Sequence, residues 1–303
     1  MRALLVDHTA PGGLRIGAAP DPVAGPHQAL VEVKATSFNF GDLSHVRDLP
    51  DGTVSGWDAA GVVRTAAADG SGPPAGTRVA TFGGEPAWAA LRAVDTAELA
   101  PLPDEVDFGQ AAALPVAGLA ALNALRRLGP LLDRRVVVTG AAGGVGRYAV
   151  QLGALAGAHV IAVAGRPERA KGLRELGAAE VVASLGEITS PVHGALDNVG
   201  GPGLAALWEL LAADGAVISI GAASGEPTVF PPYSTIGRRR RLEAYVTDVA
   251  AGSGPDLAYL VGLVASGRLD PQIGWRGSWE QAAEAAEAFF ARQVNGKAVL
   301  DVS

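Results

Sequence analysis

The sequence predicts an α/β protein in which a turn-rich β module is followed by a doubly wound parallel sheet. Up to about residue 105, short apolar runs are separated by Gly and Pro, which is typical of strands joined by turns. After residue 108, apolar runs alternate with helical stretches, and a Gly-rich turn joins one such run to the next helix. Strands that are apolar on both faces and alternate with helices belong to parallel sheets covered on both sides. A length of 303 residues fits two domains.

The predicted elements follow these two patterns along the chain. In the β module we expect strands at residues 2–7, 29–36, 59–66 and 77–83. In the second half we expect strands at residues 135–141, 159–164, 179–184, 194–199 and 215–221, with helices that begin at Gly144, Pro167 and Gly203. Two helical runs at 256–267 and 278–293 precede a last strand at 297–303. This strand needs a partner, and a return to the β module is one solution.

Composition and charge exclude several classes of protein. The net charge of −7 leaves no basic surface overall, so we expect no nucleic acid and no anionic membrane as the main partner. The chain has no cysteine, which excludes disulfides, thiolate metal sites and a thiol nucleophile. Four arginines at 238–241 form the one basic run. Such a run can bind phosphate or RNA. More commonly, it is a solvated loop before a strand.

Residues 108–125 carry no charge and raise the question of a membrane span. Gln110, Pro115, Gly118 and Asn123 interrupt this mainly alanine run, so we predict a pair of buried helices instead. The apolar run at the start of the chain is short and is soon followed by a charged residue, Asp7, which is not typical of a signal peptide. A cytoplasmic location is therefore expected.

The strongest chemical signal lies at residues 136–165, where a buried strand, a Gly-rich turn, a helix and a second strand follow one another. Gly143 and Gly146 match the last two glycines of the dinucleotide-binding fingerprint, and Ala141 stands at the first. The missing side chains let the backbone approach a pyrophosphate, and a helix that begins at Gly144 offers N–H groups and a favourable dipole. The alternative is a tight strand-to-helix turn that binds nothing.

The end of the second strand indicates which nucleotide is bound. An acidic side chain at this point holds the adenosine ribose 2′-hydroxyl of NADH. Gly165 occupies that place here, with Arg166 and Arg169 nearby. No carboxylate repels a 2′-phosphate and two guanidinium groups can pair with one, which favours NADPH. The alternative is that both arginines are ordinary solvated residues at a helix start.

Six motifs occur in order along nearly the whole chain: "SFNFGDL", "GWDAAGVV", "AAALPVAGLAALNAL", "VTGAAGGVG", "LDNVGG" and "GKAVLDV". Together they resemble the medium-chain dehydrogenase/reductase superfamily, in its zinc-free NADPH:quinone oxidoreductase branch, which includes zeta-crystallin and is related to polyketide enoyl reductases. The resemblance implies a GroES-like β-rich catalytic domain at residues 1–115 and 252–303, and a Rossmann NADPH-binding domain at residues 116–251. It also implies an oligomer: a homodimer is expected, and a tetramer stays open.

The resemblance further implies roles for individual residues. Asn39 matches the asparagine beside the nicotinamide, and Arg169 stands where a cation meets the 2′-phosphate. Lys297 matches a Gly-Lys pair near the C-terminus, for which both a structural role and a cofactor contact stay open. The residues expected to bind NADPH are Asn39, Gly143, Gly144, Val145, Gly165, Arg166, Arg169, Gly221, Tyr245 and Val246.

Metal-dependent relatives place Cys at the position of Asn39, His at that of Trp57, and a further Cys near Pro115. None of these ligands is present, so no metal site is expected. The chain also departs from the pattern of its zinc-free relatives: Ala120 replaces a threonine, and a tyrosine is missing around Ser184. Residues 44–56 form a shortened segment that lacks a tyrosine of the substrate pocket, so the substrate is not carried over by analogy.

Three functions are open. The first is reduction of a quinone or an α,β-unsaturated carbonyl compound by NADPH without a metal, in which orientation over the nicotinamide supplies most of the catalysis. The second is a dedicated enoyl reductase that acts on a polyketide or another secondary-metabolite intermediate. The third is an NADPH-binding structural or RNA-binding protein of the crystallin type.

Two residues of the segment 37–48 are candidates for catalysis. Asn39 orients the nicotinamide or donates a hydrogen bond to the hydride acceptor. His45 is the one imidazole of residues 37–48 and is either a proton donor or, more commonly for a lone histidine, a surface residue. We interpret Asp42 and Asp58 as structural residues that hold backbone N–H groups.

Overall fold

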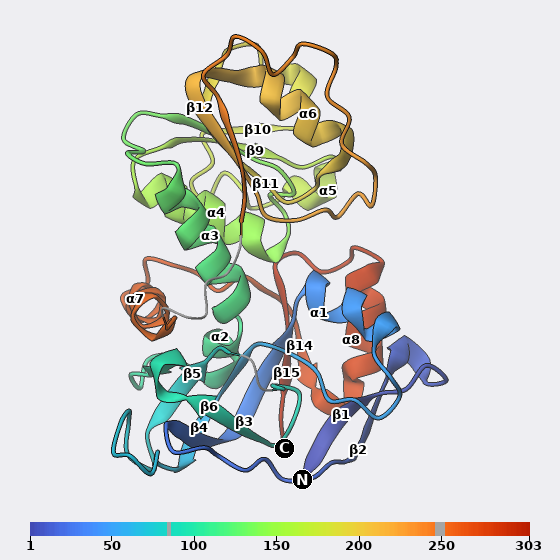
Figure 1. Ribbon diagram of the computed structural model, residues 1–303, viewed down its shortest axis with the longest axis vertical. Helices are drawn as coiled ribbons and strands as arrows, with labels where there is room; N and C mark the ends of the chain where they lie inside the picture. The colour runs from blue at the N-terminus through green and yellow to red at the C-terminus, as the bar shows by residue number, and fades with distance from the viewer. Residues whose placement is uncertain (84–85, 246–251) are drawn as a thin grey trace. The chain divides into compact units, whose positions relative to one another are not determined.

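The two ends of the chain belong to one structural unit, and the middle forms another (Figure 1). The computed structural model describes residues 1–83, 86–245 and 252–303. Unit 1 comprises Met1–Leu119 and Asp248–Ser303, and unit 2 comprises Ala120–Thr247.

Unit 1 is rich in β structure. Its strands are β1 (Arg2–Val6), β2 (Leu14–Ala18), β3 (Gln28–Phe38), β4 (Ala59–Thr65), β5 (Arg78–Thr81), β6 (Leu91–Asp95), β7 (Leu99–Pro101), β14 (Ile273–Ser278) and β15 (Lys297–Asp301). Its α-helices are α1 (Phe40–His45), α2 (Phe108–Ala112), α7 (Gly254–Ala265) and α8 (Ala282–Phe290), while α3 (Pro115–Arg127) continues into unit 2. Short 3-10 turns are η1 (Pro11–Gly13), η2 (Val46–Asp48), η3 (Thr96–Glu98) and η5 (Trp279–Gln281).

The last strand closes the main sheet of unit 1. This sheet has the order β14-β15-β3-β4-β5-β7, with β6 also paired to β3, while β1 and β2 form a separate hairpin. Strand β15 runs antiparallel to β3, with Ala298 opposite Phe38, so the return of the last strand to the β module is confirmed. Helix α8 buries Ala285 and Ala286 against the core that holds Phe38 and Trp88, and it lies beside the hairpin of β1 and β2 in Figure 1.

Unit 2 contains a parallel sheet of six strands in the order β10-β9-β8-β11-β12-β13. The strands are β8 (Arg135–Val138), β9 (His159–Val163), β10 (Glu180–Val182), β11 (Val192–Asp197), β12 (Leu211–Ser219) and β13 (Arg241–Ala244). The helices are α4 (Gly144–Leu155), α5 (Pro167–Ala170) and α6 (Gly201–Leu210), with a 3-10 turn η4 (Leu185–Glu187).

This strand order confirms the doubly wound fold. From β8 the chain moves outward through β9 to β10, then crosses to the other side of β8 and continues outward from β11 to β13. Right-handed crossovers in opposite directions place α4 and α6 on opposite faces of the sheet, as Figure 1 shows. Leu207 and Trp208 of α6 pack on the apolar side chains of Val137, Ile161 and Val217. The fold is thus α/β, with a GroES-like β-rich part and a Rossmann sheet.

Two further expectations can be compared with the structure. Residues 108–125 form the predicted helix pair, α2 and α3, and nearly all of their apolar side chains are buried. Among the described residues, no helix is long and apolar enough to cross a membrane. Helix α6 begins at Gly201 and not at Gly203, because Gly200 and Gly201 turn the chain with positive φ angles of 72° and 61°.

Candidate functional site

The ends of three strands in unit 1 bring Asn39, Asp58 and Lys297 together. Asn39 follows the last residue of β3, Asp58 precedes the first residue of β4, and Lys297 is the first residue of β15. Strand β3 pairs in antiparallel fashion with both β4 and β15. The three residues therefore meet at the same end of the sheet, although they come from distant parts of the chain.

Lys297 is buried, and its ammonium group has three acceptors. The Nζ atom donates to the Phe38 carbonyl at 3.1 Å, to Asp58 Oδ2 at 3.0 Å and to Asn39 Oδ1. The side chain is 2% exposed, and that of Asp58 is 0% exposed. An ammonium group has three donors, so Lys297 is saturated within unit 1.

The side-chain amide of Asn39 is held on both sides. Its Nδ2 atom donates to Asp42 Oδ2 at 2.9 Å and to Asp58 Oδ2 at 2.8 Å. Its backbone N–H also donates to Asp42 Oδ2, at 3.0 Å. With Ser37, whose Oγ donates to Asp58 Oδ2 at 2.8 Å, these residues form what we call the Asn39 cluster: Ser37, Asn39, Asp42, Asp58 and Lys297.

The two aspartates of the Asn39 cluster hold backbone N–H groups, as expected. Asp58 Oδ1 accepts from the Val116 N–H at 2.8 Å, which ties the start of α3 to the sheet of unit 1. Asp42 accepts from the N–H of Asn39, the residue before α1. Burial and, after it, the neighbouring charge of Asp58 together raise the pKa of Asp42 to about 7, against the lowering effect of the Asn39 hydrogen bonds. Asp42 Oδ1 is buried without a hydrogen-bond partner among the described residues.

His45 lies outside this hydrogen-bond network. It is the last residue of α1, is exposed, and packs edge-to-face on Trp57 with ring centroids 6.1 Å apart. An exposed ring that packs edge-to-face on Trp57 fits the surface alternative better than an acid held in place by hydrogen bonds.

In unit 2, the Gly-rich turn joins β8 to α4 as predicted. Gly143 precedes the helix, and the first turn of a helix leaves N–H groups without intrahelical acceptors. A Cβ atom on Gly146 would lie 2.4 Å from the Gly140 carbonyl oxygen and 2.6 Å from Ala141 Cα, so the helix approaches the turn too closely for any side chain. No acidic residue occurs in residues 139–146, so nothing in the turn itself repels an anion.

A second network, which the sequence did not reveal, holds this turn. Asp197 ends β11 and is fully buried, and its carboxylate accepts from Thr139 Oγ1 at 2.6 Å and from the Gly200 N–H at 2.9 Å. Asn198 Nδ2 donates to the Thr139 carbonyl at 2.9 Å. Both residues lie in the motif "LDNVGG", which was the only signal available. The network links the ends of β8 and β11, where the strand order reverses and α/β sheets bind their ligands.

The other described residues expected to bind the cofactor come just after strands of the unit 2 sheet, at the same end of the sheet as the Gly-rich turn. Gly165 and Arg166 follow β9 and are exposed, and Arg169 in α5 is half-buried. Gly221 follows β12, where a Cβ atom would lie 2.9 Å from the Asn198 carbonyl oxygen. Tyr245 follows β13, donates its N–H to Ser219, and lies under the Arg127 guanidinium group. Val246 lies outside the described residues.

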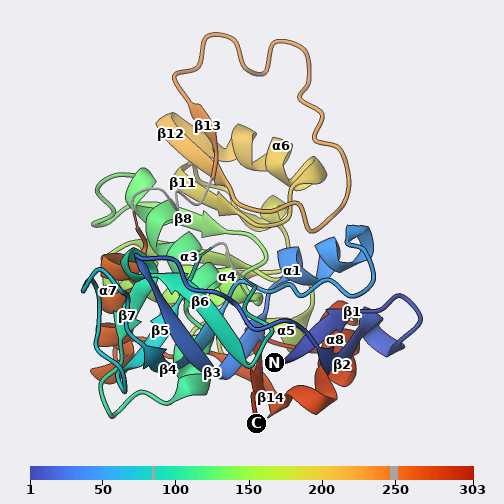
Figure 2. The same cartoon turned by 60° about the horizontal axis from the view of Figure 1, so that its bottom comes forward.

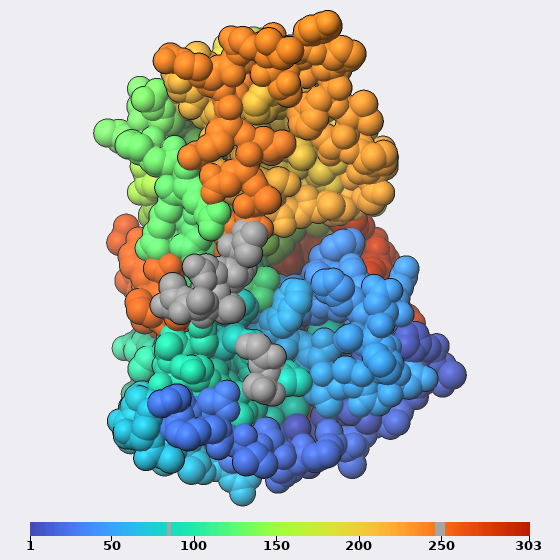
Figure 3. Space-filling model, viewed as in Figure 1, coloured from blue at the N-terminus to red at the C-terminus, as the bar shows by residue number. Residues whose placement is uncertain are grey.

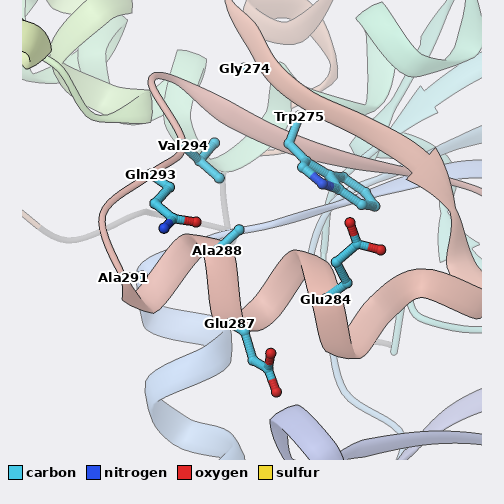
Figure 4. Close-up of a pocket in the computed structure, with 8 residues that line it drawn as sticks. All are labelled: Gly274, Trp275, Glu284, Glu287, Ala288, Ala291, Gln293 and Val294. Atoms are coloured by element: carbon cyan, nitrogen blue, oxygen red, sulfur yellow. The ribbon is translucent and has the colours of Figure 1, made fainter.

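A separate hollow of about 490 Å³ lies on unit 1, between α8 and the start of β14 (Figure 4). Trp275, Glu284 and Glu287 line it, together with Val294. None of the residues predicted from the sequence lines this hollow. Within residues 1–83, 86–245 and 252–303, no group of three or more His, Asp or Glu side chains is placed to hold a metal ion.

Arginines of the basic run have partners within unit 2. Arg238 pairs with Glu209 at 2.6 Å, Arg239 pairs with Asp214 at 2.9 Å, and Arg240 donates to the Trp208 carbonyl at 2.6 Å. The run ends a long surface segment between β12 and β13, visible in orange in Figures 2 and 3. These contacts occupy part of the run's hydrogen-bonding capacity, which weakens the RNA-binding alternative.

Comparisons with known proteins agree with this architecture. The family model described as alcohol dehydrogenase GroES-like domain matches residues 25–104, and the one described as zinc-binding dehydrogenase matches residues 144–256. A quinone oxidoreductase from Pseudomonas aeruginosa is 30% identical over 91% of this chain and 91% of its own. The trans-enoyl reductase tndF from Aspergillus flavipes is 34% identical over 63% of this chain, which spans only 62% of that enzyme's length.

Solved structures give the same result. A mycobacterial protein in complex with NADPH has a TM-score of 0.87 and 25% identity, with 99% of this chain and 100% of that chain covered. An NAD-dependent alcohol dehydrogenase has a TM-score of 0.89 and 26% identity over 100% of both chains. Unit 2 thus has the architecture of a nicotinamide-nucleotide-binding domain. The chain belongs to the medium-chain dehydrogenase/reductase superfamily, as a quinone oxidoreductase relative that is also related to the polyketide enoyl reductases.

Proposed function

We propose that the protein is an NADPH-dependent oxidoreductase that transfers hydride to a quinone or an α,β-unsaturated carbonyl compound without a metal. The observation that carries the proposal is the Gly-rich turn at the point where the strand order reverses, followed by Gly165 and Arg166 after β9. Helix α4 directs its N-terminus and its free N–H groups to the pyrophosphate, through Gly143, Gly144 and Val145.

The choice of NADPH rests on the residues after β9. Fold similarity does not decide it, because both an NADPH complex and an NAD-dependent enzyme resemble this chain equally well. Gly165 provides no carboxylate for a ribose hydroxyl, and Arg166 is an exposed cation beside it. A guanidinium group pairs well with a phosphate monoester, so Arg166 and Arg169 are the proposed contacts of the 2′-phosphate.

The chemistry follows from the same assignment. When bound, a reduced nicotinamide supplies the hydride, and a quinone or an enone accepts it without a strong electrophilic catalyst, because the resulting anion is delocalised. Asn39 contacts the nicotinamide, Gly221 and Tyr245 border it, and the Asn39 cluster keeps the Asn39 amide fixed. His45 remains a candidate proton donor to the reduced product. Catalysis by this chain is then mainly orientation.

A dedicated enoyl reductase is the second candidate, favoured by the 34% identity to a trans-enoyl reductase. Following NADPH oxidation with a panel of quinones, enones and enoyl thioesters, with NADH as the comparison, separates the two. Turnover confined to enoyl thioesters identifies the second function. NADPH binding without any turnover would favour the structural, crystallin-like role, against which the paired arginines argue.

We further propose that the protein is a cytoplasmic homodimer. Sedimentation of the purified protein tests its oligomeric state.

Replacing Arg166 by Glu tests the cofactor assignment. A charged hydrogen bond to the 2′-phosphate is worth about 1.5 to 3 kcal/mol, so we expect the Kd for NADPH to rise by roughly 10- to 100-fold and the Kd for NADH to change little. Arg134→Glu is the matched control, because Arg134 is exposed and precedes β8 at the other end of the strand. Equal losses for both nucleotides, or none, would show that Arg166 does not read the phosphate.

A further inference from the structure

The amide of Asn39 has only one hydrogen-bonding position left. A side-chain amide has two N–H donors and two acceptor lone pairs on its oxygen. Both donors are used, by Asp42 and Asp58, and one lone pair accepts from Lys297. Asn39 is 8% exposed, and among its described contacts only the second lone pair of Oδ1 is unused.

The direction of the amide is fixed by the chemistry of its neighbours. An ammonium group can only donate, so the atom that contacts Lys297 has to be the oxygen. Asp58 Oδ2 accepts from Lys297, Ser37 and Asn39 at once, so the atom that contacts it has to be the nitrogen. A flipped amide would place oxygen against carboxylate and nitrogen against ammonium. Protonation of Asp42 does not alter this, because the Oδ1 atom of Asp42 has no hydrogen-bond partner among the described residues and can carry the proton while Oδ2 accepts from the amide.

We propose that Lys297 and Asp58 are positioning residues that fix the Asn39 amide as a hydrogen-bond acceptor, which recognises the nicotinamide by an N–H of its carboxamide. This inference rests on the proposed function, and it removes one of the roles considered for Asn39. An amide whose two N–H groups are held by carboxylates does not donate to a substrate carbonyl. The hydride acceptor is then oriented without a hydrogen bond from Asn39.

The direction of the contact is tested on the unaltered protein with two analogues of NADP⁺. The 3-acetylpyridine analogue keeps the carbonyl but has a methyl group in place of the NH₂ group, and the thionicotinamide analogue keeps the NH₂ group but has sulfur in place of oxygen. Equilibrium binding by titration calorimetry gives the three Kd values without turnover. We expect the acetylpyridine analogue to bind about tenfold more weakly than NADP⁺, and the thio analogue within about threefold. Equal Kd values for NADP⁺ and the acetylpyridine analogue, or a weaker thio analogue, would overturn the proposal.

The positioning role is tested by the ratio of the Kd values of the acetylpyridine analogue and NADP⁺. In the unaltered protein this ratio should be about ten. In Lys297→Met we expect it to fall to about three or less, as in Asn39→Ala, because the Asn39 amide is no longer held in one direction. Lys297→Arg keeps the charge and should recover part of the ratio. The control is Lys34→Met, which removes a half-exposed lysine paired with Glu32 and should leave the ratio unchanged.

The outcomes separate this inference from the proposed function. A merely structural Lys297 would weaken the binding of both nucleotides by the same factor, and an unchanged ratio in Lys297→Met would therefore overturn the positioning role. If Lys297→Met does not fold, Lys297→Arg and the analogue comparison on the unaltered protein still decide the matter. If the unaltered protein binds neither NADP⁺ nor NADPH, the proposed function itself fails, and this inference fails with it.

Discussion

Asp42 and Asp58 share one buried cluster, but the ammonium group of Lys297 contacts only Asp58. Burial, and then the charge of Asp58, raise the pKa of Asp42 from 3.8 to about 7. The folded protein therefore keeps a proton on Asp42 that the unfolded chain releases. The contribution of Asp42 to the free energy of unfolding is fully present below the pKa that Asp42 has in the unfolded chain. It is lost as the pH rises toward the pKa that Asp42 has in the folded protein.

Replacing Asp42 by Asn should abolish this dependence, because the amide is neutral at every pH and its oxygen can still accept from the Asn39 N–H. Between about pH 4 and pH 7, the unaltered protein should lose on the order of 1.4 kcal/mol of its free energy of unfolding for each pH unit through Asp42, and the variant should not. Urea unfolding across this range measures it. Asp48→Asn, at an exposed position, is the control. Parallel curves for Asp42→Asn and the unaltered protein would refute the prediction.

At the level of the element, the strand-to-helix turn depends on the absence of a side chain at one position. In Gly146→Ala, the new Cβ would clash with backbone atoms of Gly140 and Ala141, which do not move without displacing α4 from β8. We expect a loss of stability of roughly 1 to 3 kcal/mol, typical of overpacking, together with weaker NADPH binding. Thermal unfolding and nucleotide titration measure the two effects.

A matched control exists in the same unit. A Cβ atom on Gly203, in α6, would have nothing within 4 Å. Gly203→Ala should therefore stabilise the protein by up to about 1 kcal/mol, since alanine favours the helix over glycine. If both variants behaved alike, the close approach at Gly146 would not be the reason for its glycine.

Local patterns predicted the elements well, and long-range contacts escaped prediction. The sheet of unit 2 was predictable because each buried strand is followed by its own helix, and this alternation is visible in a short stretch of chain. Likewise, Gly143 and Gly146 lie next to the strand and helix that they join. The contact of Lys297 with Asn39 was not predictable from spacing, because it depends on the pairing of β15 with β3, and an apolar strand fits many sheet edges. The role of Asp197 depends in the same way on the pairing of β8 with β11.

At the level of the whole molecule, the two units differ in how the chain builds them. The sheet of unit 2 comes from the continuous segment 135–244, whereas that of unit 1 joins β3, near the start of the chain, to β15, at its end. Closing a long loop costs more entropy than closing a short one, and contacts between distant residues slow folding. We therefore expect the sheet of unit 2 to form before β15 pairs with β3.

Pulsed hydrogen exchange during refolding from urea tests this order. Amides of β8, β9, β11 and β12 should become protected first, and those of β15, with their partners on β3, last. The internal control is the pairing of β3 with β4, which closes a much shorter loop within the same unit and should precede the pairing with β15. Protection of β15 together with β8 would mean that loop closure does not limit folding. Because Lys297 is the first residue of β15, the predicted order also means that the Asn39 cluster is completed only in this last step.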